Sequence, residues 1–384
     1  MKNCHYVPRL ILRRFASKKD RICLYNLKNH VFTPDVKLDD AFAIEGFYPD
    51  DLETKFNEKT ESQFAQLTKD LILSAKDGKI RLTRTQLQRI KKFLLLLIIR
   101  STQKEEWIES ERRLPKFFEA LGITDDFLFP FKEKEIEGES NHDYWLRSMN
   151  CILDSKNALP EELEKDENAT HMAWRWAWVM KSAYLAFWSN KGTDIDFLVT
   201  DVGMTSENEK SIGKHITMNP QKINSLIACA QTSTSKLVSG QFWAMASRQV
   251  YFHENFMEFP FAKNLMVVLI NPYFKVFYTF KDHGYTFPPF EALTGLTNKK
   301  AFAPNKNTYV QMGEFNDDDI FEYEIHNLTR ENCFYLNALT LDRINETLGF
   351  SNPKKILSSL EYYQSIPNKL NDYSELINQI KEKK

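Results

Sequence analysis

The sequence TRTQLQRIKKFLLLLIIR, residues 83–100, contains the strongest apolar run of the chain. Thr83 and Gln86 have the spacing of a helix capping box, in which each side chain bonds the other residue's backbone N–H group. The apolar run Phe93–Ile99 is seven residues long, whereas a helix that crosses a membrane needs about 20. The stretch therefore predicts a long helix buried in a globular core, which could continue until Pro115 stops it.

Shorter patterns on both sides of this stretch predict further helices and short strand pairs. Apolar runs around turn residues indicate hairpins, and apolar residues repeated every three or four positions indicate helices. The predicted strand pairs are 22–25 with 31–32, 182–189 with 195–200, and 265–270 with 276–280; the predicted helices are 51–75, 160–179 and 332–348, the last closing at Gly349. We therefore predict an α+β fold, predominantly helical, with a small antiparallel β-sheet built from short hairpins.

The chain length allows several domains, but the pattern favours one. A chain of 384 residues is long enough for two or three units of about 150 residues each. No internal repeat divides it. We expect residues 1–350 to form a single α+β domain, which could carry an insertion at 203–260, followed by a polar C-terminal helical tail at 351–384.

The composition indicates a soluble protein but names no reaction. Hydrophobic residues make up 42% and charged residues 27%, a balance that excludes a disordered or fibrous chain. Glycine is scarce, and the sequence contains no G-x-G-x-x-G, P-loop, G-x-S-x-G, H-E-x-x-H or C-x-x-C motif. The five scattered cysteines and the absence of an apolar leader favour a cytoplasmic protein with no membrane association.

Charge is balanced overall but uneven along the chain. The net charge is −1, yet residues 1–30 hold eight basic residues and one acidic residue, and residues 133–167 hold eleven acidic and four basic residues. A basic cluster can bind phosphate groups of nucleic acids. Alternatively, both segments are solvated faces, which could also face each other.

Several short motifs occur in an order that is typical of one bacterial family. They are HYVPR at 5–9, the pair Phe47-Tyr48, spaced Glu53 and Glu61 on a predicted helix, Arg100 at a helix end, the turn VTDVG at 199–203, and YLNA at 335–338. The chain therefore resembles the family called domain of unknown function 4238, although its turn has lost the Ser, Asn and Pro of the family's TSDNP-like turn. The resemblance implies a role in anti-phage defence, because such genes lie in mobile defence islands, but it implies no reaction.

His5 and the basic residues after it are the first candidate site. The extended backbone before Pro8 could present His5 as a general base or metal ligand. The predicted phosphate-binding residues that follow are Arg9, Arg13, Arg14 and Lys18. The alternative is a structural histidine that bonds a backbone carbonyl. The six apolar side chains interleaved with these charges predict that the segment is packed and does not hang free.

Inward-facing carboxylates are the second candidate. Glu53 falls on the apolar face of its predicted helix and Glu61 on the border, which is costly unless each is paired or bound to a metal. Arg100 and His5 are candidate partners, and a buried Glu–Arg pair that only joins two helices is the alternative. Asp201 ends a strand, where catalytic carboxylates occur, but Asp is also a common turn residue. Glu61 and Asp201 would suit Mg²⁺ or Mn²⁺.

Two nuclease patterns carry little weight. Arg248 and His253 match the R-x4-6-H pattern of one ribonuclease class, but about one such match is expected by chance in a chain of this composition. Asp35 with Glu53-x-Lys55 nominally fits PD-(D/E)xK nucleases. That motif needs its second half on a strand, whereas the residues before Glu53 indicate a helix start.

Together these features give two functional hypotheses. The first is a defence effector of the abortive-infection type that cuts RNA or DNA at a site formed by His5, Glu53, Glu61, Arg100 and Asp201, with a bound metal. The second is a non-catalytic sensor or toxin that binds a phage or host protein through its abundant aromatic residues. Either protein could form a homo-oligomer.

Overall fold

A computed structural model describes residues 3–17, 20–74, 77–101, 105–122, 131–207, 220–236, 238–239, 242–243, 245–246, 256–270 and 320–382. It has an α+β fold with three sheets that are mostly antiparallel, which confirms the predicted class. The predicted strand 276–280 lies outside the described residues. Within the described ranges, no helix combines the length and the hydropathy that crossing a bilayer requires.

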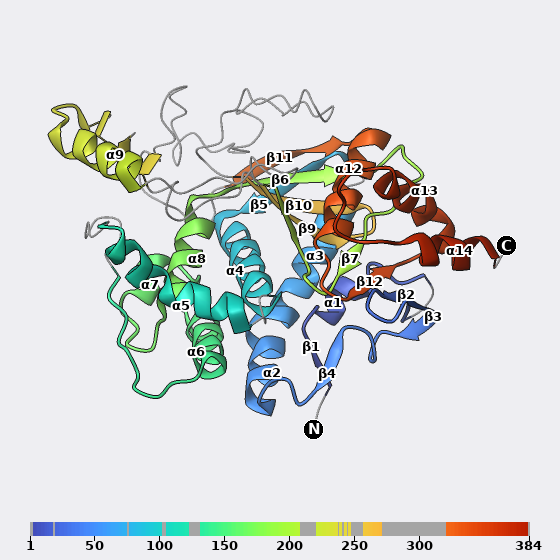
Figure 1. The fold of residues 1–384 in the computed structure, drawn as a ribbon, viewed down its shortest axis with the longest axis horizontal. Helices are drawn as coiled ribbons and strands as arrows, with labels where there is room; N and C mark the ends of the chain where they lie inside the picture. Colours follow the sequence, from blue (N-terminus) through green and yellow to red (C-terminus); the bar gives the residue numbers. More distant parts are fainter. Residues whose placement is uncertain are drawn as a thin grey trace.

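The largest sheet has six strands and lies at the centre of the molecule (Figure 1). Its spatial order is β5 (Lys79–Thr83), β11 (Ile320–Asn327), β6 (Tyr184–Ser189), β10 (Leu265–Ile270), β9 (Phe256–Ala262) and β8 (Thr205–Glu207). Only β11 and β6 pair in parallel. All six residues of β10 are buried, as expected of an apolar strand with neighbours on both sides.

Two smaller sheets hold the N-terminal strands. A four-stranded sheet has the order β3 (Val31–Lys37), β2 (Arg21–Asn26), β12 (Thr347–Phe350) and β7 (Val199–Thr200), and a two-stranded sheet pairs β1 (Asn3–His5) with β4 (Ala43–Glu45). The predicted hairpin at 22–32 is therefore confirmed as β2 and β3. Because β12 lies between β2 and β7, this sheet joins the two ends of the chain.

Helices lie on both sides of the sheets (Figure 1). The described helices are α1 (Arg9–Leu12), α2 (Asp50–Phe56), the π-helix η1 (Asn57–Glu61), α3 (Ser62–Ser74), α4 (Arg84–Ser101), α5 (Glu105–Ala120), α6 (Asn141–Asp154), α7 (Pro160–Leu163), α8 (His171–Ser182), α9 (Pro220–Thr232), α12 (Arg330–Asp342), α13 (Pro353–Gln364) and α14 (Ser374–Glu382). In Figure 1, α4 to α8 form one group, and α12 to α14 lie on the opposite side beside β2 and β3.

Helix α4 begins as the sequence predicts, but Pro115 does not have the predicted role. The Thr83 backbone N–H donates to Oε1 of Gln86 at 2.8 Å, and the Gln86 N–H donates to the Thr83 hydroxyl at 3.2 Å, so the capping box is confirmed. The apolar run Phe93–Ile99 is buried, as predicted. The prediction that Pro115 stops this helix is wrong, because Pro115 lies inside α5. Residues 102–104, between α4 and α5, lie outside the described residues. Packing of α5 on α6 and α8 outweighs the backbone hydrogen bond that a proline cannot make.

The strands predicted as one hairpin at 182–200 belong to different sheets. Strand β6 pairs with β10 and β11, whereas β7 pairs with β12. The Asn190 amide donates to the carbonyls of Ile195 and Lys263, so the turn between the strands is tied to the β9–β10 connection. The predicted turn at 190–193 is confirmed, but the prediction that the strands on either side of it pair with each other is wrong.

Two predicted helices are also corrected. Residues 160–179 form the short helix α7 and then α8, which begins where the Thr170 hydroxyl accepts the Ala173 N–H at 3.1 Å. The helix predicted to close at Gly349 ends at Asp342, and Gly349 lies in strand β12. A Cβ atom on Gly349 would lie 2.8 Å from the Phe42 ring, so this glycine permits close packing and does not stop a helix.

The C-terminal tail is helical, as predicted, and packs against its own hydrophobic cluster. Helices α13 and α14 contribute Ile356, Leu360 and Leu376, which lie with Tyr25 of β2 and Phe350 of β12. The main cluster instead covers the central sheet and α2 to α8. The last helices therefore stabilise the small sheet that brings the chain ends together.

Candidate functional site

The N-terminal segment, residues 3–17, is packed into the protein and carries the first predicted site residue. Strand β1 pairs with β4 so that His5 lies opposite Ala43. Val7 and Leu12 are buried in the main hydrophobic cluster. The prediction that this segment does not hang free is therefore confirmed.

His5 is held in one tautomer. Its side chain is buried, and Nε2 lies 3.1 Å from the carbonyl oxygen of Leu38. Because a carbonyl only accepts, Nε2 carries the proton and Nδ1 carries the basic lone pair. Burial lowers the pKa of His5 below its ordinary 6.5, although the Leu38 carbonyl acts in the opposite direction. At neutral pH, His5 is therefore an uncharged imidazole that can accept a proton at Nδ1.

Arg100, at the end of α4, connects His5 to the helix that carries Glu61. The residue is 1% exposed. Its Nη1 donates to Oε1 of Glu61 at 2.8 Å, its Nη2 donates to the backbone carbonyl of His5, and its Nε lies 3.4 Å from the Tyr48 hydroxyl. The guanidinium also lies over the Phe56 ring, 4.1 Å from its centre, in cation–π geometry. Arg100 therefore fixes the backbone of β1 against α2 and η1.

Glu53 and Glu61, the two predicted carboxylates near Arg100, lie on one continuous helical segment made of α2 and η1. Glu61 is the last residue of the π-helix η1, a wide turn that is rare in proteins and frequent at functional sites. Burial lowers the pKa of Arg100, but Tyr48, Glu61 and Glu53 outweigh it, so the net shift is upward and the cation is retained. We call His5, Tyr48, Glu53, Glu61 and Arg100 the Arg100 cluster.

Tyr48 completes the Arg100 cluster. In the sequence it stands out only as part of the Phe47-Tyr48 motif. Its ring stacks on Trp145 of α6, with centroids 5.6 Å apart, and its backbone N–H lies 3.5 Å from Sγ of Cys4. Trp145 Nε1 in turn donates to the Ile99 carbonyl at 2.7 Å. The cluster is therefore enclosed by β1, α2, α4 and α6, a convergence that the local sequence does not reveal.

Asp201 lies in a different hydrogen-bond network. Its carboxylate accepts the backbone N–H groups of Asn345, Glu346 and Thr347 at 3.1, 2.7 and 3.1 Å. Burial raises the pKa of Asp201 and outweighs these three donors, which lower it. Asp201 therefore has the contacts of a turn-stabilising carboxylate that fixes the start of β12 beside β7.

We expect Asp201→Ala to lower the free energy of unfolding by about 2 kcal/mol, because it leaves backbone N–H groups without their acceptor. Chemical denaturation would measure the change. Asp194, which is 75% exposed and lies 3.5 Å from Arg330, supplies the control, and Asp194→Ala should change stability by less than about 0.5 kcal/mol. Equal effects of the two substitutions would contradict this role for Asp201.

The residues predicted to bind Mg²⁺ or Mn²⁺ belong to separate networks. Glu61 is bonded to Arg100, and Asp201 to the backbone of β12. Among the residues that the structure describes, no group of three or more His, Cys, Asp or Glu side chains could hold a metal ion. The metal stays a prediction.

The basic residues after His5 lie on or near the surface. Arg9 pairs with Asp39, and Arg13 Nε lies 3.7 Å from Asp20; all four side chains are at least 42% exposed. Arg14 is half-buried. Lys18 lies outside the described residues, as do Arg248 and His253 of the ribonuclease-type pattern. Glu53 and Lys55 lie on helix α2, which is consistent with rejection of the PD-(D/E)xK pattern.

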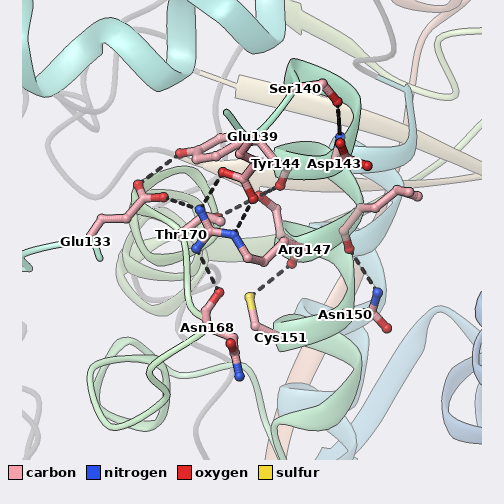
Figure 2. A network of polar contacts seen from close by, with 12 residues as sticks. Glu133, Glu139, Ser140, Asp143, Tyr144, Arg147, Asn150, Cys151, Asn168 and Thr170 are labelled. Atoms are coloured by element: carbon pink, nitrogen blue, oxygen red, sulfur yellow. Dashed lines mark hydrogen bonds and ion pairs between the residues drawn. The ribbon is translucent and has the colours of Figure 1, made fainter. Parts of the chain in front are cut away.

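Glu133 and Glu139, at the start of the acidic stretch, pair with arginines of α5 and α6. Figure 2 shows Arg147 between Glu133 and Glu139. Arg147 Nη2 lies 2.7 Å from Glu133 and its Nε 2.7 Å from Glu139. The Tyr144 hydroxyl donates to Glu133 at 3.2 Å. The excess of acidic residues is visible in the sequence, but this network is not, because the partners lie on other elements.

A large cavity borders this network, and no motif in the sequence points to it. It has a volume of about 1250 Å³ and is lined by α5, by residues 131–139 and by residues of α6 and α8. The Trp-rich helix beneath is core, as predicted, with Trp174 and Trp176 buried. The alternating glutamates from 133 to 139 were the available signal, since alternate residues of an extended segment face one side.

Comparison with known proteins identifies a family and no characterised relative. No curated protein and no solved structure matches the chain. The family model described as "Protein of unknown function (DUF4238)" matches residues 3–230, which is more than half of the chain. That span runs from β1 to α9 and includes the Arg100 cluster and Asp201. The chain therefore belongs to the DUF4238 family.

Proposed function

We propose that this chain is a cytoplasmic effector of anti-phage defence that cuts nucleic acid, with His5 as the general base. One observation carries the proposal: the buried His5 ring has Nε2 on the Leu38 carbonyl, which leaves Nδ1 as the basic nitrogen, and Arg100, paired with Glu61, holds the His5 backbone carbonyl. Burial lowers the pKa of His5, which favours the uncharged ring. A base of this kind contributes when its basic nitrogen is free of a proton at the working pH. The sequence motifs that resemble defence-island proteins supply the biological setting.

The charges beside His5 support a phosphate-bearing substrate. Arg9, Arg13 and Arg14 follow His5 within nine residues. The pairs of Arg9 with Asp39 and of Arg13 with Asp20 are exposed, and exposed pairs contribute little. A phosphate could therefore replace these carboxylates at low cost.

The other members of the Arg100 cluster would act by positioning. The Arg100 guanidinium is committed to Glu61, the His5 carbonyl and Tyr48, so it is a positioning residue and not a direct substrate ligand. His5 would take a proton at Nδ1 from the attacking hydroxyl, either water or the 2′-hydroxyl of RNA, as that oxygen bonds to phosphorus and the bond from phosphorus to the leaving oxygen breaks. The leaving oxygen would then take a proton from the His5 imidazolium or from solvent water.

We expect His5→Gln to abolish phage protection and to slow cleavage of RNA or DNA by about 10²–10⁴-fold. A Gln amide can still donate toward the Leu38 carbonyl but has no basic nitrogen, so the melting temperature should change little. His30, which is exposed on the β2–β3 turn, supplies the control, and His30→Ala should keep full activity.

Two arms of this experiment sharpen the result. RNA and DNA substrates distinguish a 2′-hydroxyl from water as the attacking group, and EDTA with re-added Mg²⁺ or Mn²⁺ tests the predicted metal. Full protection and cleavage by folded His5→Gln protein would overturn the assignment of His5 as the base.

A further inference from the structure

The cavity beside α5 has a floor whose cationic groups are already paired. Arg147 donates to Glu133 and Glu139 and also to the Asn168 carbonyl at 3.1 Å. Arg112 donates to the Glu139 carbonyl at 2.8 Å. Because these guanidinium groups have carboxylate and carbonyl partners, an anionic ligand would have to displace buried, well-paired groups.

The rim of the same cavity carries basic, acidic and apolar side chains. Lys132 lines it, and two other rim cations have carboxylate partners, Arg113 with Glu109 and Lys116 with Glu135. Glu119 and Glu137 are exposed, and neither makes a side-chain ion pair within the described part of the chain. Phe117 and Ile136 line the cavity with 48% and 43% of their surface exposed. Large apolar side chains exposed together at a hollow are typical of a binding surface.

We infer that this cavity binds a short segment of a partner protein in which an Arg or Lys stands beside an aromatic or large aliphatic residue. The cation would pair with Glu119 and Glu137, and the apolar residue would cover Phe117 and Ile136. The volume of about 1250 Å³ exceeds the roughly 300–1,000 Å³ of small-molecule pockets. A polyanionic nucleic acid would meet unpaired carboxylates at this rim, so charge complementarity favours a basic peptide.

This inference goes beyond the proposed cleavage activity and does not depend on it. It supplies a place for the partner protein of the second sequence-based hypothesis. A protein that binds here could regulate an activity at His5, because α6 contributes Arg147 to the cavity and Trp145 to the wall of the Arg100 cluster.

The probe is a fluorescent hexapeptide of alternating Arg and Phe, titrated against the full chain. A peptide of alternating Glu and Phe and a peptide of alternating Arg and Gly are the matched controls. We expect only the Arg–Phe peptide to bind, and the double variant Glu119→Lys/Glu137→Lys to weaken its binding at least tenfold. The variant Glu167→Lys/Glu382→Lys carries the same change in charge on exposed residues outside the cavity lining and should bind like the wild type.

A further variant separates the apolar contribution from charge. Phe117→Ser should weaken the Arg–Phe peptide severalfold without changing net charge. Absence of binding by the wild type, equal binding of the Arg–Gly peptide, or equal weakening by both double variants would overturn the inference. The inference would also be overturned if RNA displaced the Arg–Phe peptide and the variant Glu119→Lys/Glu137→Lys bound that peptide as tightly as the wild type does. None of these outcomes affects the His5→Gln test.

Discussion

Arg100→Ala should lower the free energy of unfolding by about 3–5 kcal/mol, the range for breaking a buried ion pair. The substitution leaves Glu61 beside an apolar helix end, removes the donor to the His5 carbonyl, and removes the cation over the Phe56 ring. Arg100→Lys should recover only part of the loss, because one ammonium cannot replace a planar guanidinium that reaches three oxygens. Denaturant titration monitored by tryptophan fluorescence would measure both variants.

The control for Arg100 is an arginine in a comparable helix but on the surface. Arg113 is 74% exposed and pairs with Glu109 one turn away, so Arg113→Ala should cost less than about 1 kcal/mol. In Arg100→Met/Glu61→Leu, the second substitution removes the stranded charge, and the double variant should lose less than the sum of the single variants. A loss below about 1 kcal/mol for Arg100→Ala would show that the cluster does not stabilise the fold.

Glu258→Gln should stabilise the protein by about 3 kcal/mol at pH 8 and have little effect at pH 4. Glu258, on β9 in the central sheet, is 0% exposed; the Thr205 hydroxyl donates to its Oε2 at 2.9 Å, and its Oε1 has no hydrogen-bond partner among the described residues. Burial raises the pKa of Glu258 from 4.5 to about 7, although Thr205 and Arg343 act to lower it. Each unit of difference between the pKa of a group in the folded state and its pKa in the unfolded state corresponds to about 1.4 kcal/mol.

The direction of the pH effect follows from proton binding. Between pH 4.5 and about 7 the folded state keeps the Glu258 proton that the unfolded state has lost, so stability falls as pH rises through this window. Gln does not titrate, and the advantage of the variant should therefore grow from pH 4 to pH 8. Melting curves at several pH values would show this growth. A pH-independent difference between Glu258→Gln and the wild type would contradict the raised pKa of Glu258.

Local sequence determined the elements whose signals lie within a few residues. The capping box of Thr83 and Gln86 fixed the start of α4, and the apolar run Phe93–Ile99 fixed its burial, because both depend on neighbours in the same helix. Alternation around turn residues located the β2–β3 hairpin for the same reason. The burial of Val7, Leu12 and Phe15 likewise follows from apolar residues among charges.

Tertiary structure decided what each element pairs with and where each ends. Strands β6 and β7 are close in sequence but pair with β10 and β12, because strand pairing depends on distant backbone partners. The sequence predicts that Gly349 closes a helix, but Gly349 lies in β12. A glycine fits there because a Cβ atom would meet the Phe42 ring.

The candidate site shows the same division. Glu61 on the border of an apolar helix face and the arginine that ends an apolar helix left a buried Glu–Arg pair as the alternative to a catalytic site, and the structure places Arg100 and Glu61 2.8 Å apart. The sequence could not place Asp201, because its three donors come from residues 345–347. It also could not reveal the cavity beside α5, which exists only where residues 131–139 fold back against α5 and α6. Sequence determined which side chains must find a partner, since burying a charge is costly wherever it occurs, and the tertiary structure alone decided which partner each one found.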